Sequence, residues 1–224
     1  NWNANGLRKK TDELKTILRE HKINVACITE THLISIHNFD IPDYKIYRVD
    51  RFTEFSVNGV IRRRGVGGVA LLVRENIISQ TQIHLDDLCL ECLDAVAVLI
   101  NINNEPTLVV SAYKPPKKNN MDDFIKLMGR NKSVIIAGDL NSKHGNWGCR
   151  VDNQSGRKLN TWIAENGYSI LAPQDPTHIP TDNNKRPDIL DVVVTKSIPF
   201  RSEQETLTGH SSDHKPVKIT FYCR

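Results

Sequence analysis

The stretch IIAGDLNSKHGNWG, residues 135–148, decides the fold class and points to a functional site. A short apolar run ends at Gly138, and Asp139, Asn141 and His144 follow within a few positions. Apolar runs bounded by glycine are typical of buried strands. In α/β folds, ligand sites gather at strand ends, because loops converge there while the sheet holds them rigid. The stretch therefore predicts a buried strand that delivers polar side chains to a site.

Similar apolar segments recur along the whole chain. The predicted strands are 23–28, 44–50, 65–73, 94–101, 106–113, 133–139, 189–194 and 216–222. The predicted helices are 8–22, 120–130 and 155–167, the last of which ends at Gly167 as its C-cap. Many strands and few helices favour a layered α/β fold in which two central sheets are flanked by helices.

Composition is that of an ordinary globular protein of 224 residues with a net charge of +4. This mild basic excess permits a polyanionic partner without demanding one. The sequence has no apolar run long enough to span a bilayer and no signal peptide, and it starts at Asn1, which we interpret as a domain taken from a longer polypeptide. The five cysteines include a single CxxC, which lacks a second pair for a zinc site and fits a reducing compartment.

Polar residues mark the ends of five separated segments. They are Asn3 and Asn5 before the first helix, Glu30 and Tyr113 after strands, Asp139 and Asn141 after the strand quoted above, and Asp213 and His214 before the last strand. Each one alone has an ordinary explanation, such as a solvated residue or an Asx turn. Their joint placement at strand ends favours a shared site.

The carboxylates and amides of this set suit metal-assisted hydrolysis of a phosphodiester. Glu30 supplies a hard oxygen ligand for Mg²⁺. Asp139 can act as a general base toward water, and Asn141 can orient that water or the phosphate without adding charge. Such chemistry depends on positioning and charge stabilisation.

The remaining groups can serve the phosphate. His214 can donate a hydrogen bond to a phosphoryl oxygen, and more strongly if Asp213 holds its other nitrogen and favours the cation. Tyr113 can donate to the same oxygen or meet the leaving group.

The motifs NWNANG, ITET, SAYKPP, GDLN, RPDILDVVV and SSDHKPV, in this order, resemble those of the exonuclease–endonuclease–phosphatase superfamily. Within it, GDLNSKHGNWG, SGRKLNTWIAENG and LAPQDPTHIP resemble the endonuclease domain of non-LTR (LINE-type, jockey-like) retrotransposons. The resemblance implies a four-layered α/β sandwich with two packed mixed β-sheets. It also implies that residues 1–224 form one endonuclease domain, the N-terminal part of a longer reverse-transcriptase polyprotein.

The resemblance also assigns roles to residues. It implies that Mg²⁺, with Mn²⁺ as a substitute, is held by Glu30, Asn3 and Asp213, with one or two ions left open. Asp191 matches the aspartate near the substrate phosphate, and Asp188 is the competing alignment. The implied catalytic set is Asn3, Tyr113, Asp139, Asn141, Asp191, Asp213 and His214.

Basic residues near the predicted site are candidates for phosphate contacts with DNA. Lys114 and Lys143 are favoured because they flank Tyr113 and Asn141, whereas solvated loops explain the other clusters equally well. His144 is a phosphate donor or a loop-stabilising residue, and Trp147 is better explained as a core indole. In the enzymes that the chain resembles, the region of residues 174–186 forms a hairpin that contacts DNA and affects target choice. The resemblance therefore implies limited target specificity for the short version here. The full DNA-binding set is Arg62, Arg63, Arg64, Lys114, Lys143, His144 and Arg186, with Lys117 and Lys118 nearby.

The expected function is metal-dependent nicking of one strand of double-stranded DNA, leaving a 3′-hydroxyl that primes reverse transcription. We expect it to act in the nucleus, linked covalently to a reverse transcriptase, away from membranes, and as a monomer when isolated. An abasic-site repair endonuclease or another phosphoesterase of the superfamily is the alternative enzyme. A catalytically dead nucleic-acid-binding module is the alternative without catalysis.

Overall fold

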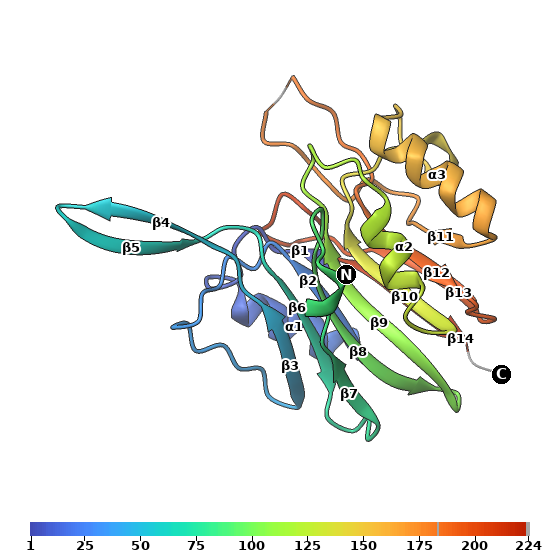
Figure 1. The fold of residues 1–224 in the computed structure, drawn as a ribbon, viewed down its shortest axis with the longest axis horizontal. Helices are drawn as coiled ribbons and strands as arrows, with labels where there is room; N and C mark the ends of the chain where they lie inside the picture. Colours follow the sequence, from blue (N-terminus) through green and yellow to red (C-terminus); the bar gives the residue numbers. More distant parts are fainter. Residues whose placement is uncertain (183, 223–224) are drawn as a thin grey trace.

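A computed structural model describes residues 1–182 and 184–222 and contains two main β-sheets (Figure 1). The first has the order β1-β2-β6-β3 and the second the order β11-β12-β10-β9-β8-β7. The strands of the first sheet are β1 (Trp2–Asn3), β2 (Val25–Thr29), β3 (Tyr44–Val49) and β6 (Val69–Arg74). Those of the second are β7 (Gln80–Ile83), β8 (Asp94–Ile102), β9 (Glu105–Tyr113), β10 (Ser133–Asp139), β11 (Ser169–Leu171) and β12 (Asp191–Lys196).

The two sheets pack face to face, as the alternation of side chains along β10 shows. Ile135 and Ala137 join a core with Cys27 and Leu71 of the first sheet. The alternate residues of β10 point to the opposite face of the sheet. There they pack against the helices α2 (Asp122–Met128) and α3 (Gln154–Asn166). The outer face of the first sheet packs on α1 (Thr11–Glu20). The predicted four-layered sandwich with mixed sheets is confirmed.

The helices lie where they were predicted, with shifts of a few residues at their ends. Asn153 is the N-cap of helix α3, and its side chain accepts a hydrogen bond from the backbone N–H of Gly156. It ends at Gly167, which has the left-handed conformation that a C-cap requires. No helix in the described part of the chain combines the length and the apolar character needed to cross a bilayer.

Six strands were not among those predicted: the two-residue β1, one strand of the C-terminal ribbon described below, and four other short or polar strands. Two of these four form the hairpin of β4 (Phe52–Val57) and β5 (Val60–Gly65), which projects far beyond the body in Figure 1. The others are β7 and β11 at the two edges of the second sheet. A further ribbon pairs β13 (Arg201–Thr206), also not predicted, with the predicted β14 (Val217–Tyr222). They lack the continuous apolar run by which the buried strands were found.

Gly138 positions the end of β10. A Cβ atom at this residue would lie 1.9 Å from the carbonyl oxygen of Ala112 in neighbouring β9, a contact that no side chain can make. The glycine in the quoted motif therefore lets β10 run close beside β9 and brings Asp139 to the sheet edge at a fixed place.

The apolar cavity of the structure does not lie at these polar strand ends. A cavity of about 610 Å³ lies at the other end of the sheets, where Val25 of β2, Ile135 of β10 and Phe221 of β14 contribute to its lining. Its lining is mainly aliphatic, so we look for the site at the polar strand ends instead.

Candidate active site

Asn3 connects the two sheets at the centre of the site. Its side-chain amide donates to Oε1 of Glu30 at 3.1 Å and to Oδ2 of Asp139 at 2.9 Å. Asn3 itself is buried, and β1 runs parallel to β2 with Asn3 opposite Thr29, the residue before Glu30. Residues separated by more than a hundred positions thus meet through one amide, and the predicted convergence of Glu30 and Asp139 is found.

Glu30 forms the more open corner of the site. Its Oε2 lies 3.5 Å from Nε2 of His32. Although burial works in the opposite direction, interactions with His32, Tyr113 and Asn3 lower the pKa of Glu30 below its usual value. The carboxylate is therefore ionised at neutral pH and partly accessible, as a metal ligand must be.

His214 lies between two aspartates of the second sheet. Its Nδ1 is 2.7 Å from Oδ2 of Asp191, and its Nε2 is 3.8 Å from Oδ2 of Asp139. The two aspartates are register partners on the antiparallel strands β10 and β12. Burial alone would lower the pKa of His214, but Asp191, Asp139 and Asp213 together raise it to about 9. The imidazole is thus cationic at neutral pH.

Asp139 is a buried base. Burial and the charge of Asp191 raise the pKa of Asp139, and the His214 cation and the hydrogen bond from Asn3 offset part of this rise. The backbone N–H of Asn141 donates to Oδ1 of Asp139 at 3.0 Å. This fixes the carboxylate, and its raised pKa makes the ionised form a better proton acceptor.

The hypothesis that Asp213 holds the second nitrogen of His214 is wrong, because Asp191 occupies that place. Asp213 instead accepts a hydrogen bond from Asn5 at 3.1 Å and lies 3.8 Å from Nε2 of His178. Despite partial burial, the interaction with His178 holds the pKa of Asp213 well below its usual range. Asp213 and His214 therefore have different hydrogen-bond partners, although they are adjacent in sequence.

The structure also separates Asp188 from Asp191. Asp188 lies 3.0 Å from Nζ of Lys143 and accepts the backbone N–H of Arg150. It does not contact His214, whereas Asp191 does. The position next to the imidazole therefore belongs to Asp191.

Tyr113 and Asn141 border the site from β9 and from the turn after β10. Burial and the charge of Glu30 raise the pKa of Tyr113 far above its usual value, so the hydroxyl keeps its proton and can donate. The side-chain amide of Asn141 donates to the carbonyl oxygen of Lys114 at 3.0 Å. Asn141 thus links the loops that follow two neighbouring strands.

One predicted DNA contact, Lys114, is contradicted by its burial. Lys114 is only 1% exposed, and its ammonium donates to the carbonyl of Lys118. Burial lowers the pKa of Lys114 to about 8, so this side chain is no surface phosphate ligand. His144 accepts the N–H of Asn146 through Nδ1, and its ring packs 5.2 Å from that of Trp147. These contacts support the alternative of a loop-stabilising residue, while contact of His144 with phosphate stays a prediction. Trp147 is the buried indole expected.

The other basic candidates lie on the surface. Lys143 is partly exposed, but its ammonium group forms an ion pair with Asp188. Arg186 is exposed. Arg62, Arg63 and Arg64 all lie on the exposed strand β5. Their contact with DNA stays a prediction.

Two histidines of the site were missed. His178 lies in the motif THIP, and its ring is 4.5 Å from that of His214. His32 contacts Glu30 from two positions along the chain. A lone histidine in a polar loop carries no periodic signal, so only the proximity of His178 to the terminal Asp-His pair identifies it.

The donor atoms of the site suit a hard divalent cation. Asp139, Asp191 and Asp213 lie around His214 and His178, and Glu30 is joined to Asp139 through Asn3. Oδ1 of Asp191 is buried without a hydrogen-bond partner among the residues described. A buried excess of carboxylates is costly unless a cation compensates it. A second group, His178, Asp213 and His214, has ligand atoms within 4.8 Å of one another. These donors are compatible with one ion and with two.

The charge of His214 gives a pH prediction. Because the folded-state pKa of His214 is raised to about 9, its cation is fully present below its ordinary value near 6.5 and is lost as the pH rises through about 9. Both activity and the stability that the cation contributes should decline over this interval. A rate profile from pH 7 to 10 on a phosphodiester substrate measures the midpoint, and a rate that stays constant through pH 10 would contradict a role for the cation.

Comparison with known proteins agrees with this architecture. The structure has a TM-score of 0.69 with the endonuclease domain of TRAS1, a telomere-specific non-LTR retrotransposon, at 19% identity over 99% of this chain and 96% of that one. It has the same TM-score with the AP endonuclease LMAP from Leishmania major, at 14% identity over 97% and 85% of the two chains. The fold is that of the exonuclease–endonuclease–phosphatase class, which supports a hydrolytic endonuclease.

The sequence comparisons identify the family within this fold class. Residues 107–218, half of the chain, match the family described as endonuclease-reverse transcriptase. The chain belongs to this endonuclease-reverse transcriptase family. It is 29% identical to the RNA-directed DNA polymerase from mobile element jockey of Drosophila melanogaster and 25% identical to the probable polymerase from transposon X-element of the same species. It spans about a quarter, 23%, of the length of these relatives. The resemblance to retrotransposon endonucleases is confirmed.

Proposed function

We propose that the protein is a Mg²⁺-dependent endonuclease that nicks one strand of double-stranded DNA and leaves a 3′-hydroxyl for target-primed reverse transcription. The observation that carries the proposal is the amide of Asn3 joining Glu30 to Asp139, with the His214 cation beside it. In this proposal a reverse transcriptase lies in the same polypeptide, as the names and lengths of the relatives suggest. The domain acts in the nucleus and is monomeric when isolated.

The geometry supports attack by water on the scissile phosphorus. Asp139 accepts a proton from the water, whose oxygen forms the new bond to phosphorus. The cation of His214 stabilises the negative charge that develops on the phosphoryl oxygens. The bond from phosphorus to the 3′ oxygen breaks, and that oxygen takes a proton from solvent to become the 3′-hydroxyl. The Tyr113 hydroxyl, which keeps its own proton at neutral pH, donates a hydrogen bond to the leaving oxygen.

Glu30 and Asn3 would hold the cation on one side, with Asp213 as the further predicted ligand on the other. In the present arrangement Asn3 turns its NH₂ group toward the two carboxylates, so it would ligate only after its amide turns over. When bound, Mg²⁺ supplies charge neutralisation at the phosphate and holds it in position. Asn141 keeps the carboxylate of Asp139 oriented throughout.

Metal removal tests the proposal directly. Purified protein should convert supercoiled plasmid to open circles in the presence of Mg²⁺, and excess EDTA should abolish the conversion until Mg²⁺ is restored. A DNA polymerase should extend the nicks without prior treatment, because they carry 3′-hydroxyl ends. Nicking that persists in EDTA, or ends that block extension, would contradict the assignment.

Substrate comparison separates the alternatives. A duplex with one synthetic abasic site should be cut no faster than the same duplex without it, and a phosphoinositide should release no phosphate. A strong preference for the abasic duplex would instead favour a repair enzyme. Binding of DNA without cleavage under any divalent metal would favour a catalytically dead module.

A further inference from the structure

The hairpin β4–β5 is an arm that lies outside the layered body (Figure 1). Its strands have six residues each and are joined by Asn58 and Gly59, both with positive φ, as a tight two-residue hairpin turn requires. Nearly every residue of the arm is exposed, including Phe55 and Val60. An isolated two-stranded ribbon is marginally stable in water. Exposed apolar side chains on such a ribbon therefore indicate a surface that binds another molecule.

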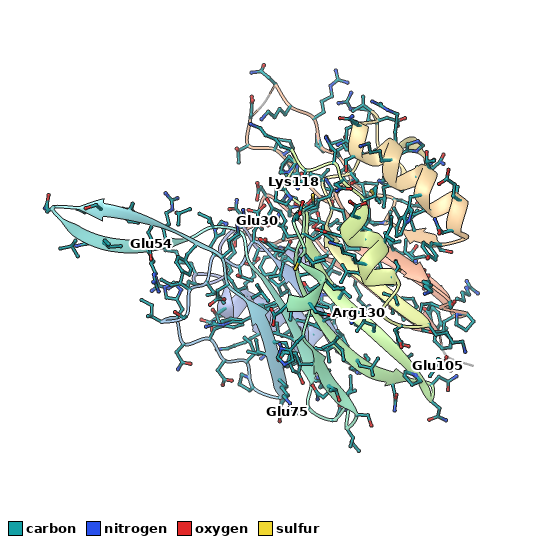
Figure 2. The ribbon with its side chains drawn as sticks, viewed as in Figure 1. Glu30, Glu54, Glu75, Glu105, Lys118 and Arg130 are labelled. Carbon is teal, nitrogen blue, oxygen red and sulfur yellow. The ribbon has the colours of Figure 1, made fainter. Side chains whose placement is uncertain are left out.

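The arm is rooted beside the active site. Gly65 at its base packs against the backbone of His32, where a Cβ atom would lie 2.1 Å from the carbonyl oxygen. The backbone N–H of His32 donates to Gly67 at 2.9 Å, and His32 contacts Glu30. Figure 2 shows Glu30 where the arm leaves the body and Glu54 farther out along it. A substrate at the site is therefore within reach of the arm.

The two faces of the arm differ in charge. Cross-strand partners share a face, so Glu54 lies with Arg63, and Phe55 lies with Arg62. Arg63 is 2.9 Å from Glu54 and lies over the ring of Phe52 at 4.5 Å, so its charge is already satisfied within the arm.

The opposite face, here called the Arg62 face, contains no acidic residue. Arg62 and Arg64 have no ion-pair partner in the described part of the chain. Three exposed apolar side chains lie with them. The members of the Arg62 face are Thr53, Phe55, Val57, Val60, Arg62 and Arg64.

We propose that the Arg62 face binds the sugar–phosphate backbone of duplex DNA beside the cleavage site, which rests on the proposed function. Arg62 and Arg64 each neutralise one phosphate, while Phe55 and Val60 contact the sugars between them. A strand of six residues is about 20 Å long. At about 3.4 Å per base pair this corresponds to about six base pairs of contact on one side of the nick. Charge complementarity favours DNA over a protein partner, because unpaired guanidinium groups flank the apolar residues.

Salt dependence of binding tests the proposal independently of cleavage. Affinity for a 30-base-pair duplex is measured in EDTA at several salt concentrations for the parent protein, Arg62→Ala/Arg64→Ala and Arg63→Ala. The double variant should lose about two units of the slope of log K against log salt, because each phosphate contact contributes about 0.9. Arg63→Ala should keep the slope, since its partner is Glu54. Equal slopes for all three proteins, or an equal loss in Arg63→Ala, would overturn the proposal.

Substrate length gives a second readout. The parent protein should nick a duplex with at least ten base pairs on each side of the cleavage site faster than one trimmed to three on one side. The double variant should lose this preference. If the parent protein cuts no DNA, the proposed function fails while the salt slopes still test the arm. A preference retained by the double variant, together with an unchanged slope, would assign the arm to a protein partner instead.

Discussion

The variant Asp139→Asn is expected to nick supercoiled DNA at least about 10³-fold more slowly than the parent protein. Asparagine has nearly the same shape and still accepts the hydrogen bond from the N–H of Asn141, so the local backbone is retained. It cannot take a proton from water, and it removes the anion that faces His214 at 3.8 Å. Initial rates in saturating Mg²⁺ measure the effect.

Stability and DNA binding serve as controls for this variant. Because burial and Asp191 raise the pKa of Asp139, its ionisation costs more free energy in the folded state than in the unfolded chain. Removal of that charge favours the folded state, whereas the NH₂ group that replaces Oδ2 loses the hydrogen bond from the amide of Asn3. A melting curve therefore checks that the variant is folded, and its affinity for duplex DNA in EDTA should remain. A rate within tenfold of the parent protein would exclude Asp139 as the base.

The second large effect is expected for Asp191→Asn. The charge of Asp191 and its 2.7 Å contact are the main influences that raise the pKa of His214 to about 9. Loss of one opposite charge at this range should move the alkaline midpoint of the rate profile down by about one to three pH units. At pH 8 the variant should therefore be slower by about 10² or more, both because the cation is lost and because the ring is no longer oriented.

Asp188→Asn is the matched control, since Asp188 is the neighbouring buried aspartate of the same motif. It contacts Lys143 and the N–H of Arg150 instead of the imidazole, so its substitution should leave the alkaline midpoint in place even if it costs stability. A shift of the midpoint in Asp188→Asn, and none in Asp191→Asn, would reverse the assignment of the two aspartates.

Much of this site was predictable because its parts are short and local. An apolar run that ends in Gly-Asp-Leu-Asn signals a buried strand with polar residues at its tip, and the structure places Asp139 and Asn141 there. Glu30 and His214 follow the same logic at other strand ends. The sequence order of these pieces also carried the resemblance from which the fold class was predicted.

Partners across the fold were harder to predict. Which acid faces His214 depends on the register of β10 with β12, which brings Asp191 to Asp139, and adjacency in sequence pointed to Asp213 instead. Lys114 was taken for a surface cation because lysines usually are, yet the loop after β9 buries it. The β4–β5 arm has no buried face, so no hydrophobic pattern marked it.

The shared amide of Asn3 has a mechanical consequence. Glu30 follows a strand of one sheet and Asp139 ends a strand of the other, and a single planar group spans the seam between them. Any sliding of one sheet over the other would stretch this bridge before it disturbed the interior of either layer. The cleavage rate should therefore depend on the alignment of the two sheets. On heating, cleavage should be lost at a lower temperature than the one at which the protein unfolds.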